Sequence, residues 1–126
     1  MKMVQLDPAT TFQQQLAGSG TGPVVLINRF TVPPGFEAEF LDLWREDAAY
    51  MLSHGCLSAQ MHKGTEGSTS FVNIALWENA QALARAFASE EFQGLLARYP
   101  DTCTISPHLF TRIAVPGVCV GDSVGA

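Results

Sequence analysis

The stretch Phe-Val-Asn-Ile-Ala-Leu-Trp, residues 71–77, determines how the rest of this sequence can fold. Its apolar character is typical of a buried strand, which the polar Asn73 interrupts. Asn73 and Trp77 are four residues apart, and an even spacing places both side chains on one face of a sheet. Because a buried asparagine without partners costs about 1–3 kcal/mol, we expect this face to meet a structural partner or a cavity with polar contents.

The sequence on either side of this stretch alternates between strand and helix patterns. Apolar residues recur at three- and four-residue steps in the helical segments, and glycine, proline and capping residues separate the segments. The predicted elements, in chain order, are a strand over 24–32, a helix over 34–53, a strand over 56–63, a hairpin turn over 64–67, a strand over 68–77, helices over 80–88 and 90–98 capped by Asn79 and Ser89, and a strand over 102–115. Within the last strand, Pro107 indicates an edge or a bulge.

This order, β-α-β-β-α-β, predicts a ferredoxin-like α+β fold. Its four-stranded antiparallel sheet carries both helices on one face. We expect residues 24–115 to form this domain, preceded by a flexible arm over residues 1–23 with a short helical turn around 11–16. Residues 116–126 are predicted to form a loose tail, because they contain three glycines and small side chains.

The other face of the predicted sheet has no cover within the chain. It is nonetheless apolar, because Val25, Ile27, Val72, Ile74 and Leu76 all point away from the helices. Leaving this face in water would forfeit several kcal/mol at about 25 cal/mol per Å². We therefore expect a second copy of the chain to cover it, which gives a homodimer packed sheet against sheet.

Composition and charge exclude several classes of function. The 126 residues carry a net charge of −5, and the seven cationic residues are scattered, which argues against a nucleic-acid partner. No apolar run is long enough for a membrane span. The three cysteines are far apart in the sequence, which favours reduced thiols in the cytoplasm. The acidic residues Glu37, Glu39, Asp42, Glu46 and Asp47 indicate a solvated helix face rather than a metal site.

Three segments of the sequence resemble a known family. They are NRFTVPPGFEAEFLDLW (residues 28–44), GCLSAQMHKGTEGSTSFVNIALWENAQAL (55–83) and ASEEFQ (88–93). Together they are similar to the antibiotic biosynthesis monooxygenases, a family of dimeric α+β barrels, and the similarity extends over about residues 24–115. The family includes cofactor-free oxygenases of aromatic polyketides, haem-degrading enzymes and small proteins of unknown role.

The resemblance to the quinone-forming monooxygenases implies a site. In that subgroup, an asparagine and a tryptophan that match Asn73 and Trp77 line the substrate cavity between sheet and helices. His62 matches a histidine of the same cavity. Two tyrosines of the subgroup fall on Met61 and Leu83 here, so the resemblance leaves the proton donor unidentified.

The resemblance to the haem-degrading branch is weaker. Asn28 matches an asparagine of that branch. The positions of its tryptophan and of its iron-binding histidine fall on about Ala86 and Leu96. Neither residue has a nitrogen that could bind the haem iron, so haem would lack its usual axial ligand. Haem degradation is therefore a weaker hypothesis than an oxygenase or a non-catalytic binder.

The resulting hypothesis is a monooxygenase without cofactor or metal that oxidises a polycyclic aromatic, such as an anthrone or a naphthol, with O2. Asn73 and Trp77 are expected to donate hydrogen bonds to the substrate enolate, and His62 is the candidate base. The residues expected to contact substrate are Asn28, Phe40, Trp44, Met61 and Leu83. Because Met61 and His62 are adjacent on a strand, His62 instead faces the dimer or the strand end if Met61 faces the cavity. A non-catalytic small-molecule binder of the same fold is the alternative.

Overall fold

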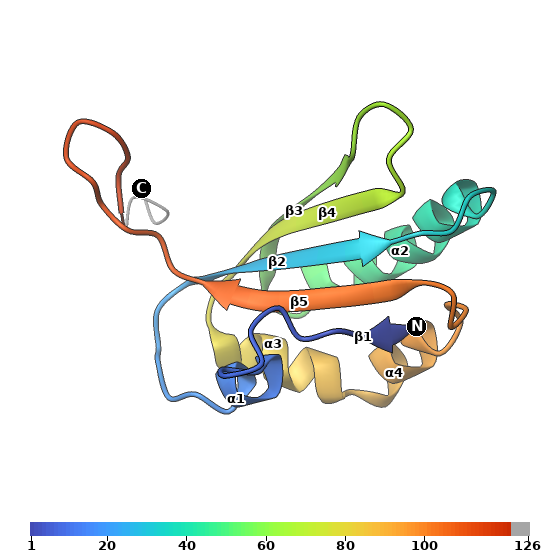
Figure 1. Cartoon of the computed structure of the whole chain (residues 1–126). Coiled ribbons are helices and arrows are strands. Elements are labelled where there is room, and N and C mark those ends of the chain that lie inside the picture. Colours follow the sequence, from blue (N-terminus) through green and yellow to red (C-terminus); the bar gives the residue numbers. More distant parts are fainter. Residues whose placement is uncertain (122–126) are drawn as a thin grey trace.

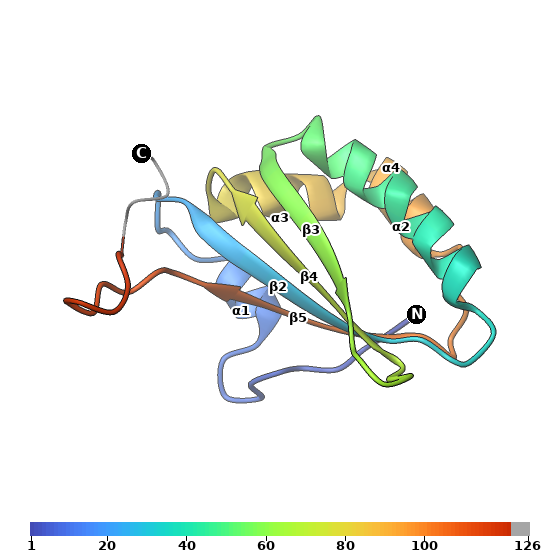
Figure 2. The ribbon, with the colours of Figure 1, turned by 90° about the horizontal axis from the view of Figure 1, so that it is seen from above.

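The computed structural model describes residues 1–121, which form one five-stranded sheet with helices on one side (Figure 1). The strands are β1 (Lys2–Met3), β2 (Val24–Thr31), β3 (Cys56–Lys63), β4 (Ser70–Trp77) and β5 (Thr104–Phe110). The helices are α1 (Phe12–Leu16), α2 (Glu37–Leu52), α3 (Ala80–Ala88) and α4 (Glu90–Leu96). Figure 2 shows α2, α3 and α4 on the same side of the sheet, as the ferredoxin-like pattern predicts.

The strand order is β1-β5-β2-β4-β3, and every pair except β1 with β5 is antiparallel. The prediction of four strands is therefore wrong by one, because β1 adds a short parallel strand at the edge. The backbone N–H of Lys2 donates to Cys103 at 3.1 Å, and that of Val4 donates to Ile105 at 2.8 Å. A strand of two residues is too short to have a readable periodicity, so the sequence pattern does not reveal it.

The N-terminal segment is packed, which corrects the expectation of a flexible arm for its first part. Phe12 at the start of α1 is 0% exposed and contacts the ring of Phe87 edge to face. Thr11 caps α1 through a reciprocal capping box with Gln14, which confirms the short helix. From the same helix, the side-chain amide of Gln15 both donates to the carbonyl of Leu109 and accepts from its N–H.

Gln15 and β1 together explain how Pro107 is tolerated inside β5. The backbone groups of residues 103, 105 and 109 that face away from β2 bond to β1 and to Gln15. Pro107 is an odd-numbered residue like these three, so its backbone also faces away from β2. It lies between the residues that bond to β1 and the residue that bonds to Gln15. The N–H that proline lacks would therefore not have bonded to β2. The predicted strand continues to Val115, whereas β5 ends at Phe110.

Helix boundaries follow the capping residues. The Asn79 side chain accepts from Ala82 N at 2.7 Å to begin α3, and the Ser89 hydroxyl accepts from Phe92 N at 3.2 Å to begin α4. Between β3 and β4, Gly67 takes a φ of 75° that glycine adopts without strain. Beyond β5, Val115 pairs with Cys119 in a small hairpin. The part of the predicted tail over residues 122–126 lies outside the described residues.

Candidate active site

The alternation along β4 decides what lies beneath the helices. Phe71, Asn73, Ala75 and Trp77 are buried against the helices. The intervening residues point to the open face of the sheet, where Ile74 is 43% exposed. This arrangement confirms the assignment of the two faces that the spacing of Asn73 and Trp77 predicts.

A cavity lies between this face of the sheet and the helices α2 and α4. The volume of this cavity is about 50 Å³. The side chains around it are Met1, Leu26, Asn28, Phe30, Trp44, Asp47, Ala48, Met51, Cys56, Ala59, Asn73, Ala75, Trp77, Phe92, Leu96 and Ile105. Most of these are apolar, and the space is narrow for a three-ring aromatic. A ligand of that size therefore has to displace side chains such as Trp44 or Met51.

Four side chains around the cavity each carry one buried polar atom without a hydrogen-bond partner. Five buried side-chain nitrogen and oxygen atoms in residues 1–121 have no hydrogen bond, and four of them belong to residues that line this cavity. These are Asn28 Oδ1, Asn73 Oδ1, Asp47 Oδ1 and Trp77 Nε1. Because a buried polar group without a partner costs about 1–3 kcal/mol, their gathering in one cavity indicates a place where a polar ligand binds.

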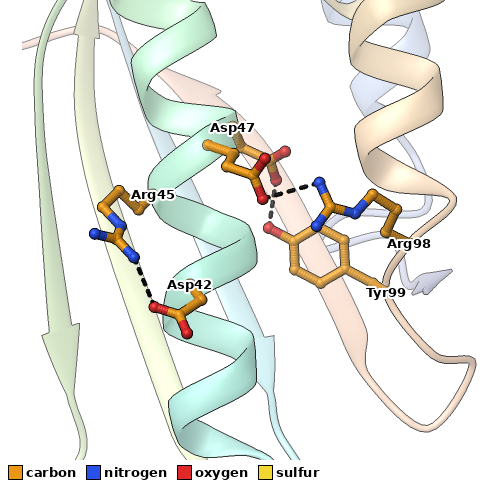
Figure 3. Close-up of polar contacts among 6 residues, drawn as sticks. Asp42, Arg45, Asp47, Arg98 and Tyr99 are labelled. Atoms are coloured by element: carbon orange, nitrogen blue, oxygen red, sulfur yellow. Dashed lines mark hydrogen bonds and ion pairs between the residues drawn. The ribbon is translucent and has the colours of Figure 1, made fainter.

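Asp47 also lines this cavity, although the sequence pattern predicts a solvated helix face for its acidic side chain. Asp47 is 8% exposed, and its carboxyl accepts a hydrogen bond from the hydroxyl of Tyr99 (Figure 3). Burial raises its pKa from 3.8 to about 6, against the lowering effect of the Tyr99 hydroxyl. The expectation that all five acidic residues of this region lie on a solvated face is therefore wrong for Asp47.

A signal for Asp47 is present in the sequence. It is three residues after Trp44 and four before Met51, and both of these line the cavity. This spacing places all three on one face of α2. The carboxylate interrupts an apolar stripe in the same way that Asn73 interrupts an apolar strand.

Apart from His62, the site residues predicted from the sequence divide into two groups. Asn28, Trp44, Asn73 and Trp77 come together around the cavity as expected. The remaining three apolar residues pack in the core behind it: Leu83 against the cluster of Trp77, and Phe40 and Met61 in the cluster of Phe71.

His62 lies on the opposite face of the sheet, which corrects its assignment as the cavity base. It pairs with Val72 across the β3–β4 ladder, its side chain is exposed, and Nδ1 lies 3.2 Å from the Val72 carbonyl oxygen. The alternation with Met61 is the physical reason, because adjacent strand residues point to opposite faces.

The described residues contain no cluster of side chains suited to a metal ion, and no histidine lines the cavity. Residues 1–121 contain no group of three or more His, Cys, Asp or Glu side chains close enough to hold a metal ion. None of the three histidines, His54, His62 and His108, is among the residues around the cavity. The positions that correspond to the haem-degrading tryptophan and histidine are occupied by the buried Ala86 and by Leu96. None of the helices within residues 1–121 is long and apolar enough to cross a membrane.

The chain matches one protein-family model and several solved structures. The model of the family described as antibiotic biosynthesis monooxygenase matches residues 23–98. The crystal structure of SnoaB, a cofactor-independent oxygenase from Streptomyces nogalater, is 29% identical with a TM-score of 0.68, covering 76% of this chain and 98% of that one. A protein from Shewanella loihica PV-4 is 25% identical with a TM-score of 0.65, covering 77% of this chain and 100% of its own. A protein from Pseudomonas aeruginosa is 25% identical with a TM-score of 0.64, covering 77% of this chain and 100% of its own. Among curated proteins there is no match.

Proposed function

Since the chain belongs to the antibiotic biosynthesis monooxygenase family, we propose that it is a monooxygenase that oxidises a flat aromatic substrate with O2 and needs no cofactor. The substrate class is an aromatic that loses a proton to form an enolate or a phenolate, such as an anthrone or a naphthol. The observation that carries the proposal is the set of unpartnered buried polar atoms in an otherwise apolar cavity. The similarity to SnoaB, a cofactor-independent oxygenase, supports the same reaction type.

In this reaction the substrate supplies the electrons. Loss of a proton gives an enolate, which transfers one electron to O2, and recombination of the two radicals gives a peroxide. Expulsion of water then leaves a carbonyl, so that one oxygen atom enters the product and the other leaves as water. The protein has to hold the flat ring, stabilise the enolate oxygen and exclude bulk water.

The cavity residues fit these tasks. The indole N–H of Trp77 is buried and free to donate, and its ring offers a wide apolar wall. Each of the Asn28 and Asn73 amides has an NH2 group that can donate to a developing oxyanion, and an unpartnered oxygen that can accept from a substrate hydroxyl. Apolar side chains such as Leu26 and Phe30 complete the walls and exclude water.

The test is oxygen uptake with anthrone and with 1-naphthol, without added flavin, haem or metal and with a chelator present. We expect turnover by the wild type and a loss of about 10- to 100-fold in Trp77→Phe, which keeps the apolar wall but removes the N–H donor. Arg45→Ala is the control, because Arg45 is exposed on the outer side of α2 and pairs with Asp42 (Figure 3). Equal turnover in Trp77→Phe and the wild type would refute the assigned site. Stabilisation by the ligand without oxygen uptake would indicate a non-catalytic binder.

We also propose that the protein is a cytoplasmic homodimer that packs through the open sheet face. That face presents Val25, Ile27, Val72, Ile74 and Leu76, continued by Phe110 on β5. Ile74 and Phe110 remain 43% and 39% exposed, which is costly for an isolated chain. These apolar side chains lie beside one another on β2, β4 and β5, with polar neighbours such as Arg29, Gln60 and His62 on the same face, and a second copy would cover them by twofold symmetry. The cytoplasmic location rests on the odd number and wide spacing of the cysteines.

A further inference from the structure

The proposed reaction begins with the loss of a substrate proton, and the cavity has to supply a group that accepts it. The amides of Asn28 and Asn73 and the indole of Trp77 have no basic atom at neutral pH. His62, the base expected from the sequence, lies on the other face of the sheet. The ionisable groups of the residues around the cavity are the carboxyl of Asp47, the thiol of Cys56 and the N-terminal amine of Met1. The amine is engaged elsewhere, because it donates to the carbonyl of Tyr99 at 3.2 Å and pairs with Asp101 at 3.4 Å.

Cys56 does not fit the role of the base. Burial raises the pKa of its thiol, so the thiol stays protonated at neutral pH. Its sulfur already donates to the carbonyl of Ser58 at 3.3 Å. Asp47 is therefore the side chain of this lining that can carry a negative charge at neutral pH.

We propose that Asp47 is the catalytic base of the cavity, that its Oδ1 takes the proton from the substrate, and that Tyr99 holds the carboxylate in position. This inference rests on the proposed oxygenase function and adds the residue that starts its chemistry. The geometry carries it. Oδ2 accepts the hydrogen bond from the Tyr99 hydroxyl, while Oδ1 is buried without a partner in the wall of the cavity. One oxygen is thus anchored and the other is free to react.

The charges around Asp47 leave it reactive. On its own helix, Glu46 raises its pKa, and Arg98, beyond the end of α4, lowers it. Arg98 is engaged elsewhere, because its guanidinium pairs with Glu46 at 2.8 Å at the surface. The phenol of Tyr99 stays neutral, since burial and the Asp47 charge raise its pKa far above the usual value. With a pKa of about 6, Asp47 is mostly ionised at pH 7.5 and still basic enough to accept a proton.

The Asp47 carboxylate can carry out both proton transfers of the reaction. With an anthrone, the C–H bond breaks, the proton moves to Oδ1, and the electron pair stays on the substrate as an enolate. O2 adds to the enolate carbon, and the resulting peroxide anion takes the proton back from Asp47. Asp47 then removes the second proton from the same carbon while the O–O bond breaks. The expelled hydroxide takes that proton and leaves as water, and the carbon becomes a carbonyl.

The experiment compares the wild type, Asp47→Asn and Arg45→Ala with anthrone as the probe. Asparagine has the shape of aspartate and can still accept from Tyr99, so the fold is preserved. Exchange of the anthrone C–H for deuterium is followed without O2 by mass spectrometry, which reads the proton step alone. Oxygen uptake is followed separately from about pH 5 to 9, and binding of the product, anthraquinone, reports whether the cavity is intact.

We expect Asp47→Asn to lower both exchange and oxygen uptake by about 100-fold or more at pH 7.5. The rise of the wild-type rate with an apparent pKa near 6 should vanish in this variant, while anthraquinone affinity stays within about threefold. Arg45→Ala should behave as the wild type. If Asp47→Asn retains exchange and uptake within about threefold, Asp47 is not the base and the oxygenase proposal stands. If the wild type neither exchanges nor oxidises the probe, both proposals are overturned.

Discussion

Asn28 and Asn73 lie directly opposite each other on the neighbouring strands β2 and β4, and the side-chain oxygen of each is buried without a hydrogen-bond partner. Opposite residues on one face of a sheet have their Cβ atoms about 4.5–5.5 Å apart. Two amides at this distance could bond to each other, yet neither oxygen is used. The pair therefore presents two unused hydrogen-bond acceptors in the wall of the cavity that Trp77 also lines.

The first prediction separates the free Asn73 from the structural Asn79. Asn73→Ala should lower turnover by about 100-fold, because it removes a donor to the enolate oxygen. It should change the free energy of unfolding by less than about 1 kcal/mol, because no hydrogen bond of its side chain is lost. Asn79→Ala removes the cap of α3, so it should cost about 1 kcal/mol and leave turnover unchanged. Oxygen uptake and urea unfolding measure the two quantities, and a reversed pattern would contradict the assignment.

The second prediction concerns the open face of the sheet. Ile74→Glu places a charge at the centre of the proposed dimer interface, so we expect it to convert a dimer into a monomer. Light scattering after size exclusion gives the mass. Leu52→Glu is the matched control, because Leu52 is 50% exposed at the end of α2, away from the sheet. A wild type with the mass of one chain would rule out the dimer.

The sequence predicts those elements whose pattern is long and regular. The eight residues of β4 alternate in burial, and the even spacing of Asn73 and Trp77 is enough to place both beneath the helices. The capping residues Asn79 and Ser89 likewise fix the starts of α3 and α4. These features are local, so one sequence contains the information needed to place them.

Two features escape the same reasoning because they depend on contacts between distant segments. β1 is two residues long and exists only through its bonds to β5, about one hundred positions away. The burial of Asp47 depends on Tyr99, 52 positions further on, because this partner makes a carboxyl tolerable beneath a helix. Residue type alone predicts that an aspartate lies at the surface. The position of Asp47 on the apolar stripe of α2 is the better predictor of its burial.

The third prediction tests whether the N-terminal segment belongs to the folded core. Phe12→Ala should lower the free energy of unfolding by about 3–5 kcal/mol, because the ring is fully buried in the core cluster that contains Trp77 and Leu83 and contacts the ring of Phe87. Leu6→Ala in the same segment should cost less than about 1 kcal/mol, because Leu6 is 52% exposed. Urea unfolding measures both. Similar small values for the two variants would mean that the segment does not contribute to the core.

The last prediction is that Asp47 destabilises the protein at neutral pH. Its pKa is raised from 3.8 to about 6 in the folded state, mainly by burial. A group with a raised folded-state pKa contributes stability below its unfolded pKa and loses that contribution as the pH rises through the folded value. Relative to acid pH, the ionised carboxylate should therefore cost about 3 kcal/mol above pH 6.

Asp47→Asn removes this titration, so it should be more stable than the wild type at pH 7.5 by up to about 3 kcal/mol. The difference should shrink as the pH falls through 6 toward 4, and urea unfolding across this range measures it. Asp42→Asn is the control, because Asp42 is exposed and its replacement should change the free energy of unfolding by less than about 1 kcal/mol. A variant less stable than the wild type at every pH would mean that the Tyr99 bond outweighs the cost of burial. A gain at neutral pH together with lost turnover would identify Asp47 as a group that serves the reaction at the expense of the fold.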